Sequence, residues 1–139
     1  ITNYLRHHSR SYIFTASITP ASTAAAMKAI DILIAEPERQ EHLWSITHEA
    51  LQGFRDMGCE IGHTETPIIP LFIRDNNKTF AITRDLLNEG IFVNPVVSPA
   101  VAPNDTLIRF SLMATHTKDQ VTYALEKIQK VFRAYGLVP

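Results

Sequence analysis

Apolar and polar positions follow two periods along the chain, one typical of helices and one typical of strands. Apolar residues at helical spacing predict four longer helices, over residues 21–35, 37–57, 78–89 and 118–135. Shorter apolar runs predict strands over residues 68–73, 91–93 and 106–112. This order of elements predicts an α+β domain, in which helices cover a small, three- to four-stranded and largely antiparallel sheet.

Capping and turn residues mark where several of these elements begin and end. Thr19 and Pro20 suit the N-cap and the first position of the first helix. Gly90 suits the position that ends the third helix. Pro67 and Pro70 flank or interrupt the first strand, so we expect that strand at a sheet edge or a bulge.

The second and the last helix are each expected to bury one apolar face against the sheet. The expected inward positions are Leu43, Trp44, Ile46, Leu51 and Phe54 in the second helix, and Val121, Leu125, Ile128, Val131 and Phe132 in the last.

Composition limits the classes of protein that fit this pattern. The chain has 139 residues, 45% of them hydrophobic, so it can bury one core and is expected to form a single domain. Thirteen basic and fourteen acidic residues leave a net charge of −1, which argues against nucleic acid and anionic membrane surfaces as partners. No apolar run reaches the roughly 20 residues that span a bilayer. The chain opens at Ile1 without an initiator Met or a signal peptide, so we expect a processed chain or a piece of a longer one.

The sequence contains few patterns that by themselves predict a disulfide, a metal site or a catalytic nucleophile. The one cysteine, Cys59, excludes an intrachain disulfide, fits a reducing compartment and is expected to be an inert, partly buried thiol. The six histidines are scattered, and the adjacent His7 and His8 are a weak metal signal, so no metal site is predicted. No nucleophile with its base is visible, so we expect no catalytic residue within this chain.

Arg109 is the polar residue of greatest interest. Strand alternation places Ile108, Phe110 and Leu112 on the core face and Arg109 with Ser111 on the other face. A guanidinium group suits the bidentate capture of a carboxylate or a phosphate. The alternative is an arginine on a solvent-facing sheet surface, and the spacing alone leaves both interpretations open.

Two further segments could border a ligand. Thr15 and Ser17 shortly precede a predicted helix start, where hydroxyl and backbone N–H groups can bind an anion or can simply cap the chain. Residues 94–103 contain three prolines and are unusually apolar for a loop. That loop therefore borders a pocket, packs against another domain or is a plain surface loop.

Four ordered motifs resemble one enzyme family and together cover essentially the whole chain. They are RSYIFTASITP at 10–20, TPIIPLFI at 66–73, EGIFVN at 89–94, and LIRFS followed by ATHT at 107–117. The chain resembles the C-terminal, small domain of the α-oxoamine synthases, which are pyridoxal-phosphate (PLP) enzymes of the aspartate aminotransferase-like fold (fold type I). The Phe-Thr-Ala-Ser form of the first motif looks most like the serine palmitoyltransferases. The 8-amino-7-oxononanoate synthases and glycine C-acetyltransferases are relatives.

The resemblance implies an activity and roles for three residues. Family members join an amino acid, here serine by preference, to an acyl-CoA with loss of CO₂, which gives a 2-amino-3-ketone. Arg109 matches the arginine that binds the substrate carboxylate. Thr15 and Ser17 match hydroxyl residues that reach the PLP phosphate of the neighbouring subunit. The implied protein is a cytoplasmic homodimer of sphingolipid biosynthesis, in which residues 1–19 lead from a large domain and residues 20–139 form the small domain.

The chain departs from the family at the lysine that forms the Schiff base with PLP. That lysine lies upstream in a Ser-Lys-x-x-Gly context, which none of Lys28, Lys78, Lys118, Lys127 and Lys130 has. The isolated chain is therefore expected to be inactive. Two alternatives stay open: a free-standing α+β ligand-binding or dimerisation module without catalysis, and an aminotransferase-type PLP enzyme.

Overall fold

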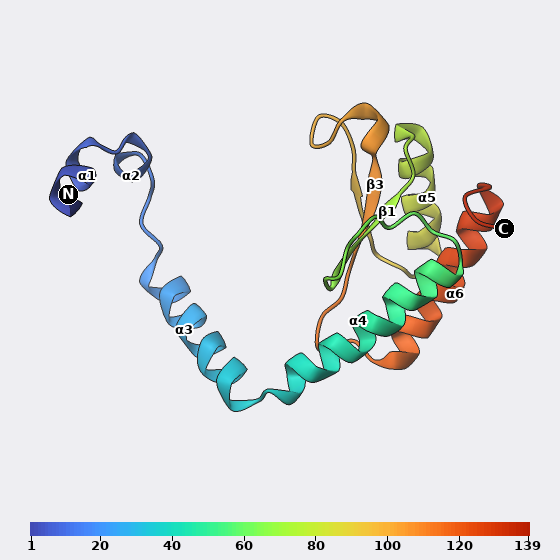
Figure 1. Ribbon diagram of the computed structural model, residues 1–139, viewed down its shortest axis with the longest axis horizontal. Coiled ribbons are helices and arrows are strands. Elements are labelled where there is room, and N and C mark those ends of the chain that lie inside the picture. Colours follow the sequence, from blue (N-terminus) through green and yellow to red (C-terminus); the bar gives the residue numbers. More distant parts are fainter. The chain divides into compact units, whose positions relative to one another are not determined.

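The computed structural model describes residues 1–139, which divide into two units, Ile1–Pro37 and Glu38–Pro139. The first unit contains three helices, α1 (Thr2–His8), α2 (Arg10–Ile13) and α3 (Pro20–Ala35) (Figure 1). The sequence pattern did not predict α1 and α2, because helices of 7 and 4 residues are too short to show a period.

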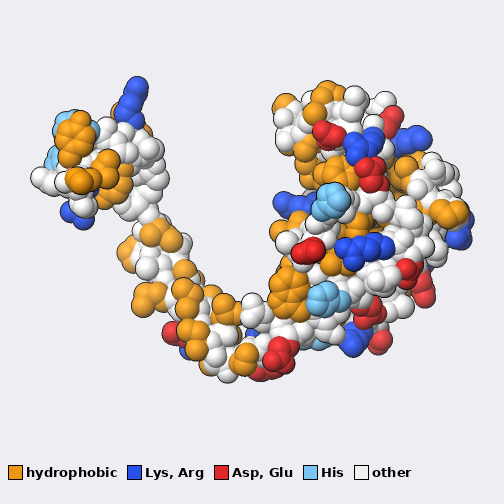
Figure 2. All heavy atoms as spheres, viewed as in Figure 1, with side chains coloured by type: hydrophobic (Ala, Val, Ile, Leu, Met, Phe, Trp, Pro, Cys, Tyr) orange, Lys and Arg blue, Asp and Glu red, His pale blue; other side chains and the backbone are white.

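Helix α3 begins where the sequence predicts. Pro20 occupies the first turn, and the Thr19 hydroxyl accepts a hydrogen bond from the Ser22 backbone N–H at 3.2 Å. None of its residues is buried, and Figure 2 shows hydrophobic side chains exposed along the helix. The apolar stripe that predicts this helix, Ala25, Ile30, Leu33 and Ile34, is therefore open on the surface of this unit.

The second unit is built on a three-stranded antiparallel sheet, which confirms the predicted fold class. Its strands are β1 (Ile68–Phe72), β2 (Asn94–Val96) and β3 (Leu107–Ser111), and β3 lies between the other two. Helices α4 (Glu38–Asp56), α5 (Asn76–Asn88) and α6 (Lys118–Ala134) cover the sheet, and a short 3₁₀ helix, η1 (Pro103–Asp105), precedes β3 (Figure 1). None of the helices combines the length and the apolar character that crossing a bilayer requires.

The predicted position of β2 was wrong by three residues. The sequence pattern placed a strand at 91–93, whereas the ladder begins at Asn94, which pairs with Arg109. Gly90 ends α5 with a positive φ of 82°, and the Ile91 N–H donates to the Leu86 carbonyl at 2.8 Å. The apolar residues after Gly90 therefore close the helix end and reach the sheet only at Asn94.

The core lies between one face of the sheet and the three helices. Ile69 and Leu71 of β1 and Ile108 of β3 are fully buried, as strand alternation predicts. The ring of Phe54 on α4 meets the ring of Phe110 edge-on at a centroid distance of 5.2 Å. These contacts fix the inner face of β3 and leave its outer face open.

The predicted buried face of α4 was correct except at Trp44. Ile46, Leu51 and Phe54 are buried, whereas Trp44 is 38% exposed and stacks on His48 at a centroid distance of 5.9 Å. The buried residues recur at helical spacing from Ile46 to Phe54, and Trp44 lies at the edge of that stripe.

Strand β1 is an edge strand, as its prolines predict. The Leu112 N–H donates to the Pro67 carbonyl and the Ile73 N–H to the Thr106 carbonyl, which sets the hydrogen-bonded pairs of the ladder. Pro70 lies opposite Arg109 in a non-hydrogen-bonded pair of this ladder, so its nitrogen points away from β3. Its missing N–H therefore removes no hydrogen bond from the sheet.

Glu89 ties the end of α5 to α6. Its carboxylate accepts hydrogen bonds from Lys127 Nζ at 2.7 Å and Lys130 Nζ at 2.6 Å, and the Tyr123 hydroxyl donates to its carbonyl at 3.1 Å. The bond from Lys127 and then that from Lys130 lower the pKa of the Glu89 carboxyl to about 2. This ion-pair cluster holds the chain at the point where it leaves α5 for β2.

Replacing Glu89 by Gln should destabilise the protein at pH 7 and have little effect near pH 2. The folded-state pKa lies below the ordinary value of 4.5, so the contribution is complete above about pH 4.5 and is lost as the pH falls toward 2. Thermal unfolding midpoints of wild type and variant between pH 7 and pH 2 measure the difference. Glu126→Gln, at an exposed position of α6, is the matched control. A gap between wild type and Glu89→Gln that stays constant over this range would contradict the role.

Candidate functional site

Arg109 stands at the centre of the sheet on the face opposite the core. It lies on β3 between Pro70 of β1 and Asn94 of β2, and its side chain is exposed. The sequence-based assignment of Arg109 to the outer face is therefore confirmed. Its guanidinium makes no hydrogen bond or ion pair with the rest of the chain, so all of its donors are available to a ligand.

Arg74, two residues beyond the end of β1, shows how differently a structural arginine behaves. Its guanidinium binds the Glu60 carboxylate, Asp105 Oδ1 at 2.9 Å and the Asn104 carbonyl at 3.0 Å, and lies over the ring of Phe72. These bonds hold the end of β1 against the segment that leads into β3. The guanidinium of Arg74 is thus held by several acceptors within the chain, whereas that of Arg109 has none.

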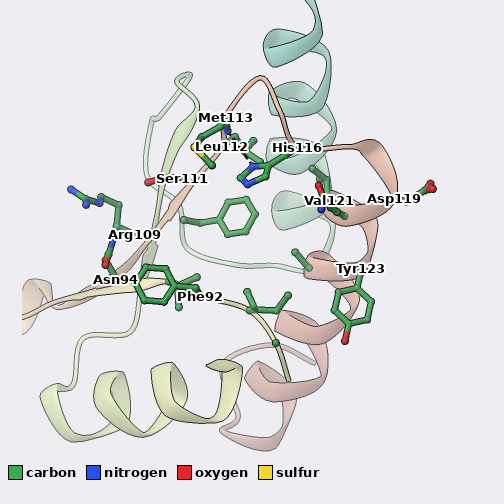
Figure 3. A pocket seen from close by; sticks show the side chains of 16 residues that line it. Phe92, Asn94, Arg109, Ser111, Leu112, Met113, His116, Asp119, Val121 and Tyr123 are labelled. Carbon is green, nitrogen blue, oxygen red and sulfur yellow. Dashed lines mark hydrogen bonds between the residues drawn. The ribbon is translucent and has the colours of Figure 1, made fainter. Parts of the chain in front are cut away.

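Arg109 borders two cavities. One, of about 770 Å³, is called here the β3–α6 cavity and is lined by residues 90–94, 109–113, 116, 119–121, 123 and 124 (Figure 3). The other, of about 620 Å³, is lined by residues 94–100 together with Arg109. The proline-rich loop therefore borders a pocket, which is one of the three roles that its composition allowed. Arg109 and Asn94 belong to both cavities.

A network of backbone and histidine contacts fixes the turn between β3 and α6. The Met113 N–H donates to His116 Nδ1 at 3.2 Å, and His42 Nε2 on α4 donates to the His116 carbonyl at 2.8 Å. Thr117 and Gln120 then form a capping box at the start of α6. The sequence predicted no role for His42, because its partner lies 74 residues away and no local pattern connects them.

Thr15 and Ser17 lie in the first unit, between α2 and α3, and both are exposed. The Thr15 hydroxyl donates to the Ser11 carbonyl, whereas the Ser17 hydroxyl makes no hydrogen bond within the chain. An exposed hydroxyl near a helix start suits a phosphate group, so Ser17 fits such a ligand as it stands. Thr15 fits it after giving up its bond to Ser11.

Cys59 and two of the five lysines are held in states that do not favour nucleophilic attack. Cys59 is half-buried, and burial raises the pKa of its thiol to about 11, so it is protonated and a weak nucleophile at neutral pH. Lys127 and Lys130 are both paired with Glu89. No cluster of three or more metal-ligating side chains is present.

Comparison with known proteins identifies the family to which the chain belongs. The family model for aminotransferase class I and II matches residues 1–128. Serine palmitoyltransferase of Bacteroides ovatus is 56% identical over 138 residues, which are 99% of this chain and 35% of that protein. The 8-amino-7-oxononanoate synthase 1 of Bacillus subtilis is 38% identical over the same shares of the two chains.

Solved structures agree with the sequence comparison. Serine palmitoyltransferase of Sphingomonas wittichii superposes with a TM-score of 0.82 at 35% identity and covers 99% of this chain and 35% of that one. A variant of the S. paucimobilis enzyme with bound PLP and myriocin gives a TM-score of 0.85 at 33% identity, over 98% of this chain and 35% of that one.

The chain belongs to the aminotransferase class I and II family, and its sheet and helices match a domain of the fold type I PLP enzymes. Within that family it resembles the serine palmitoyltransferases and, at lower identity, the 8-amino-7-oxononanoate synthases. The resemblance to the α-oxoamine synthases is therefore confirmed. The chain spans about a third of the length of these relatives.

Proposed function

We propose that this chain is the small domain of a PLP-dependent acyltransferase that condenses an amino acid, serine by preference, with an acyl-CoA. The products are a 2-amino-3-ketone, CO₂ and free CoA. The observation that carries the proposal is the unpaired guanidinium of Arg109, held at the centre of a rigid sheet between two cavities. The 56% identity to a serine palmitoyltransferase supports serine as the amino acid.

Arg109 would bind the carboxylate of the amino acid. A guanidinium presents two parallel N–H donors to the two oxygens of a carboxylate, and this pairing fixes both the position and the plane of the group. Strand β3 supplies the rigidity, because Arg109 is flanked on both sides by paired strands. A fixed carboxylate also fixes the two bonds at Cα that must break, to hydrogen and to the carboxyl carbon.

Thr15 and Ser17 would donate hydrogen bonds to the PLP phosphate of the neighbouring subunit. PLP, when bound, supplies the electron sink that stabilises negative charge at Cα. The uncommitted Ser17 hydroxyl and the hydroxyl of Thr15 suit this role, provided that Thr15 releases the Ser11 carbonyl. None of the five lysines lies in a Ser-Lys-x-x-Gly context, and Lys127 and Lys130 are held by Glu89, so we infer that the lysine that anchors PLP lies outside this chain.

We also propose that the whole enzyme is a homodimer, since two subunits would then share each site, and that it acts in the cytoplasm in sphingolipid biosynthesis. The relatives at 56% identity are named serine palmitoyltransferases, which supports serine and a palmitoyl group as substrates.

An activity assay of the full-length protein tests the proposal. With PLP, serine and palmitoyl-CoA it should release CO₂ and CoA in equal amounts, whereas the isolated 139-residue chain should release neither. Activity of the isolated chain would contradict the inferred position of the anchoring lysine. Amino-group transfer to a 2-oxo acid without any need for acyl-CoA would instead indicate an aminotransferase. A full-length protein that binds ligands without either reaction would indicate a binding module.

A further inference from the structure

The outer face of the sheet is apolar apart from one polar corner. Directly opposite residues of an antiparallel ladder share a face, so the register determines which residues lie on the face of Arg109. The polar ones are Asn94, Arg109 and Ser111, and the others are Ile68, Pro70, Phe72, Val96 and Leu107. Figure 3 shows the three polar side chains on the same side of the sheet, with that of Arg109 directed away from the β3–α6 cavity. A few polar groups that converge on a largely apolar surface are typical of a site that orients a ligand.

The backbone of Asn94 is fixed to that of Arg109. Pro70 and Arg109 form a non-hydrogen-bonded pair, so the backbone N–H and C=O of Arg109 point toward β2 and pair with those of Asn94. Directly opposite side chains have Cβ atoms about 4.5–5.5 Å apart. Ser111 lies two residues further along β3, about 7 Å from Arg109, and β2 does not reach it. Asn94 is therefore the polar neighbour best placed to share one ligand group with Arg109.

The carboxamide of Asn94 has no partner within the chain. Asn94 is half-buried, its side chain makes no hydrogen bond, and it borders the same two cavities as Arg109. Asparagine is also depleted in strands, where β-branched and aromatic residues fit better. The strand itself therefore gives no reason for a carboxamide at this position.

A carboxylate held by Arg109 leaves room for a second donor. Its two oxygens offer about four acceptor sites, and the paired N–H groups of the guanidinium would occupy two of them. The carboxamide of Asn94 carries two N–H donors on the neighbouring strand. We propose that Asn94 donates a hydrogen bond to the amino-acid carboxylate that Arg109 binds, and so fixes that group from a second side. This inference rests on the proposed function and adds a second binding residue to its amino-acid site.

Asn94→Val in the full-length, PLP-loaded protein tests this role. Valine suits a strand, so the ladder with β3 should stay intact while the carboxamide is lost. In titrations followed by PLP absorbance, the Kd should rise about tenfold for L-serine and for L-alanine, which corresponds to one hydrogen bond of about 1.4 kcal/mol. The Kd of ethanolamine, which is serine without its carboxylate, should change by less than about twofold. The matched control is Asn77→Val at an exposed position of α5.

Asn94→Asp separates a binding role from a structural one. This variant keeps the shape of the side chain but replaces its donors by a negative charge. Its Kd for L-serine should exceed that of Asn94→Val, because the new carboxylate repels that of serine and competes for Arg109. A Kd no higher than that of Asn94→Val would mean that the side chain supports the sheet without contacting the ligand, and would contradict the proposal.

Three further outcomes would overturn the role of Asn94 while the proposed function stands. If Asn94→Val weakened ethanolamine and serine equally, the contact would not be with the carboxylate. A loss for serine without one for alanine would place the carboxamide on the serine hydroxyl. Unchanged Kd values would place Asn94 outside the site. If the wild-type protein makes no product from serine and any acyl-CoA, the proposed function itself fails, and the role of Asn94 fails with it.

Discussion

Arg109→Ala in the full-length enzyme should raise the KM for serine about 10- to 100-fold and leave the KM for the acyl-CoA within about twofold. The variant removes the charge-assisted hydrogen bonding to the carboxylate, and a net loss of about 1.5–3 kcal/mol, with water replacing the guanidinium, corresponds to this range. The effect on stability should be small, because the side chain is exposed and makes no hydrogen bond within the chain. Steady-state kinetics with each substrate varied in turn measure both constants.

Two further variants sharpen this measurement. Arg109→Lys keeps the charge but loses the planar pair of donors, so its KM for serine should lie between those of wild type and Arg109→Ala. Arg84→Ala on α5 is the matched control, since Arg84 is 74% exposed and pairs only with the adjacent Asp85, at 3.6 Å. An equal rise in both KM values for Arg109→Ala would contradict a role in carboxylate binding.

Phe54→Ala should destabilise the second unit by about 3–5 kcal/mol, the cost typical of truncating a fully buried phenylalanine. The variant leaves a cavity between α4 and β3 and removes the edge-on contact with Phe110. Amide hydrogen exchange of β3 in the full-length protein measures the effect. Those amides should exchange about 150- to 5,000-fold faster if they exchange by unfolding of the unit.

Phe80→Ala makes the same substitution at an exposed position of α5 and serves as control. Its effect on the exchange of β3 should be small, since surface substitutions usually change stability by less than about 0.5 kcal/mol. If the β3 amides exchanged at the same rate in Phe54→Ala and Phe80→Ala, the core contact between α4 and β3 would not stabilise the strand that carries Arg109.

The fold was largely predictable because its signals are local. Helical spacing found α3 to α6 within one or two residues of their ends, and alternation placed Ile108 and Phe110 on the core face of β3. The prediction failed where a local signal had two interpretations. The apolar residues after Gly90 look like a strand but close the end of α5, and Trp44 lies at the edge of a buried stripe.

The candidate site was predictable only in part. The sequence indicated Arg109 and its face, but the unpaired state of its guanidinium depends on residues from other elements and has no sequence signal. The β3–α6 cavity arises because β2 starts opposite Arg109, so its walls at Phe92 and Met113 could not be recognised before the register was known. The roles of Arg109, Thr15 and Ser17 stay predictions until the assays above are made.

The strand order has a consequence for how the chain is made on the ribosome. The central strand, β3, is the last of the three to be synthesised, and β1 and β2 have no contact with each other in the sheet. The sheet therefore cannot begin to form until β3 starts to leave the exit tunnel, and until then both earlier strands stay unpaired. Each carries a proline, Pro70 or Pro95, which removes one donor from any ladder with another nascent chain. The same two prolines that are tolerated at the edges of the finished sheet thus limit aggregation before it forms.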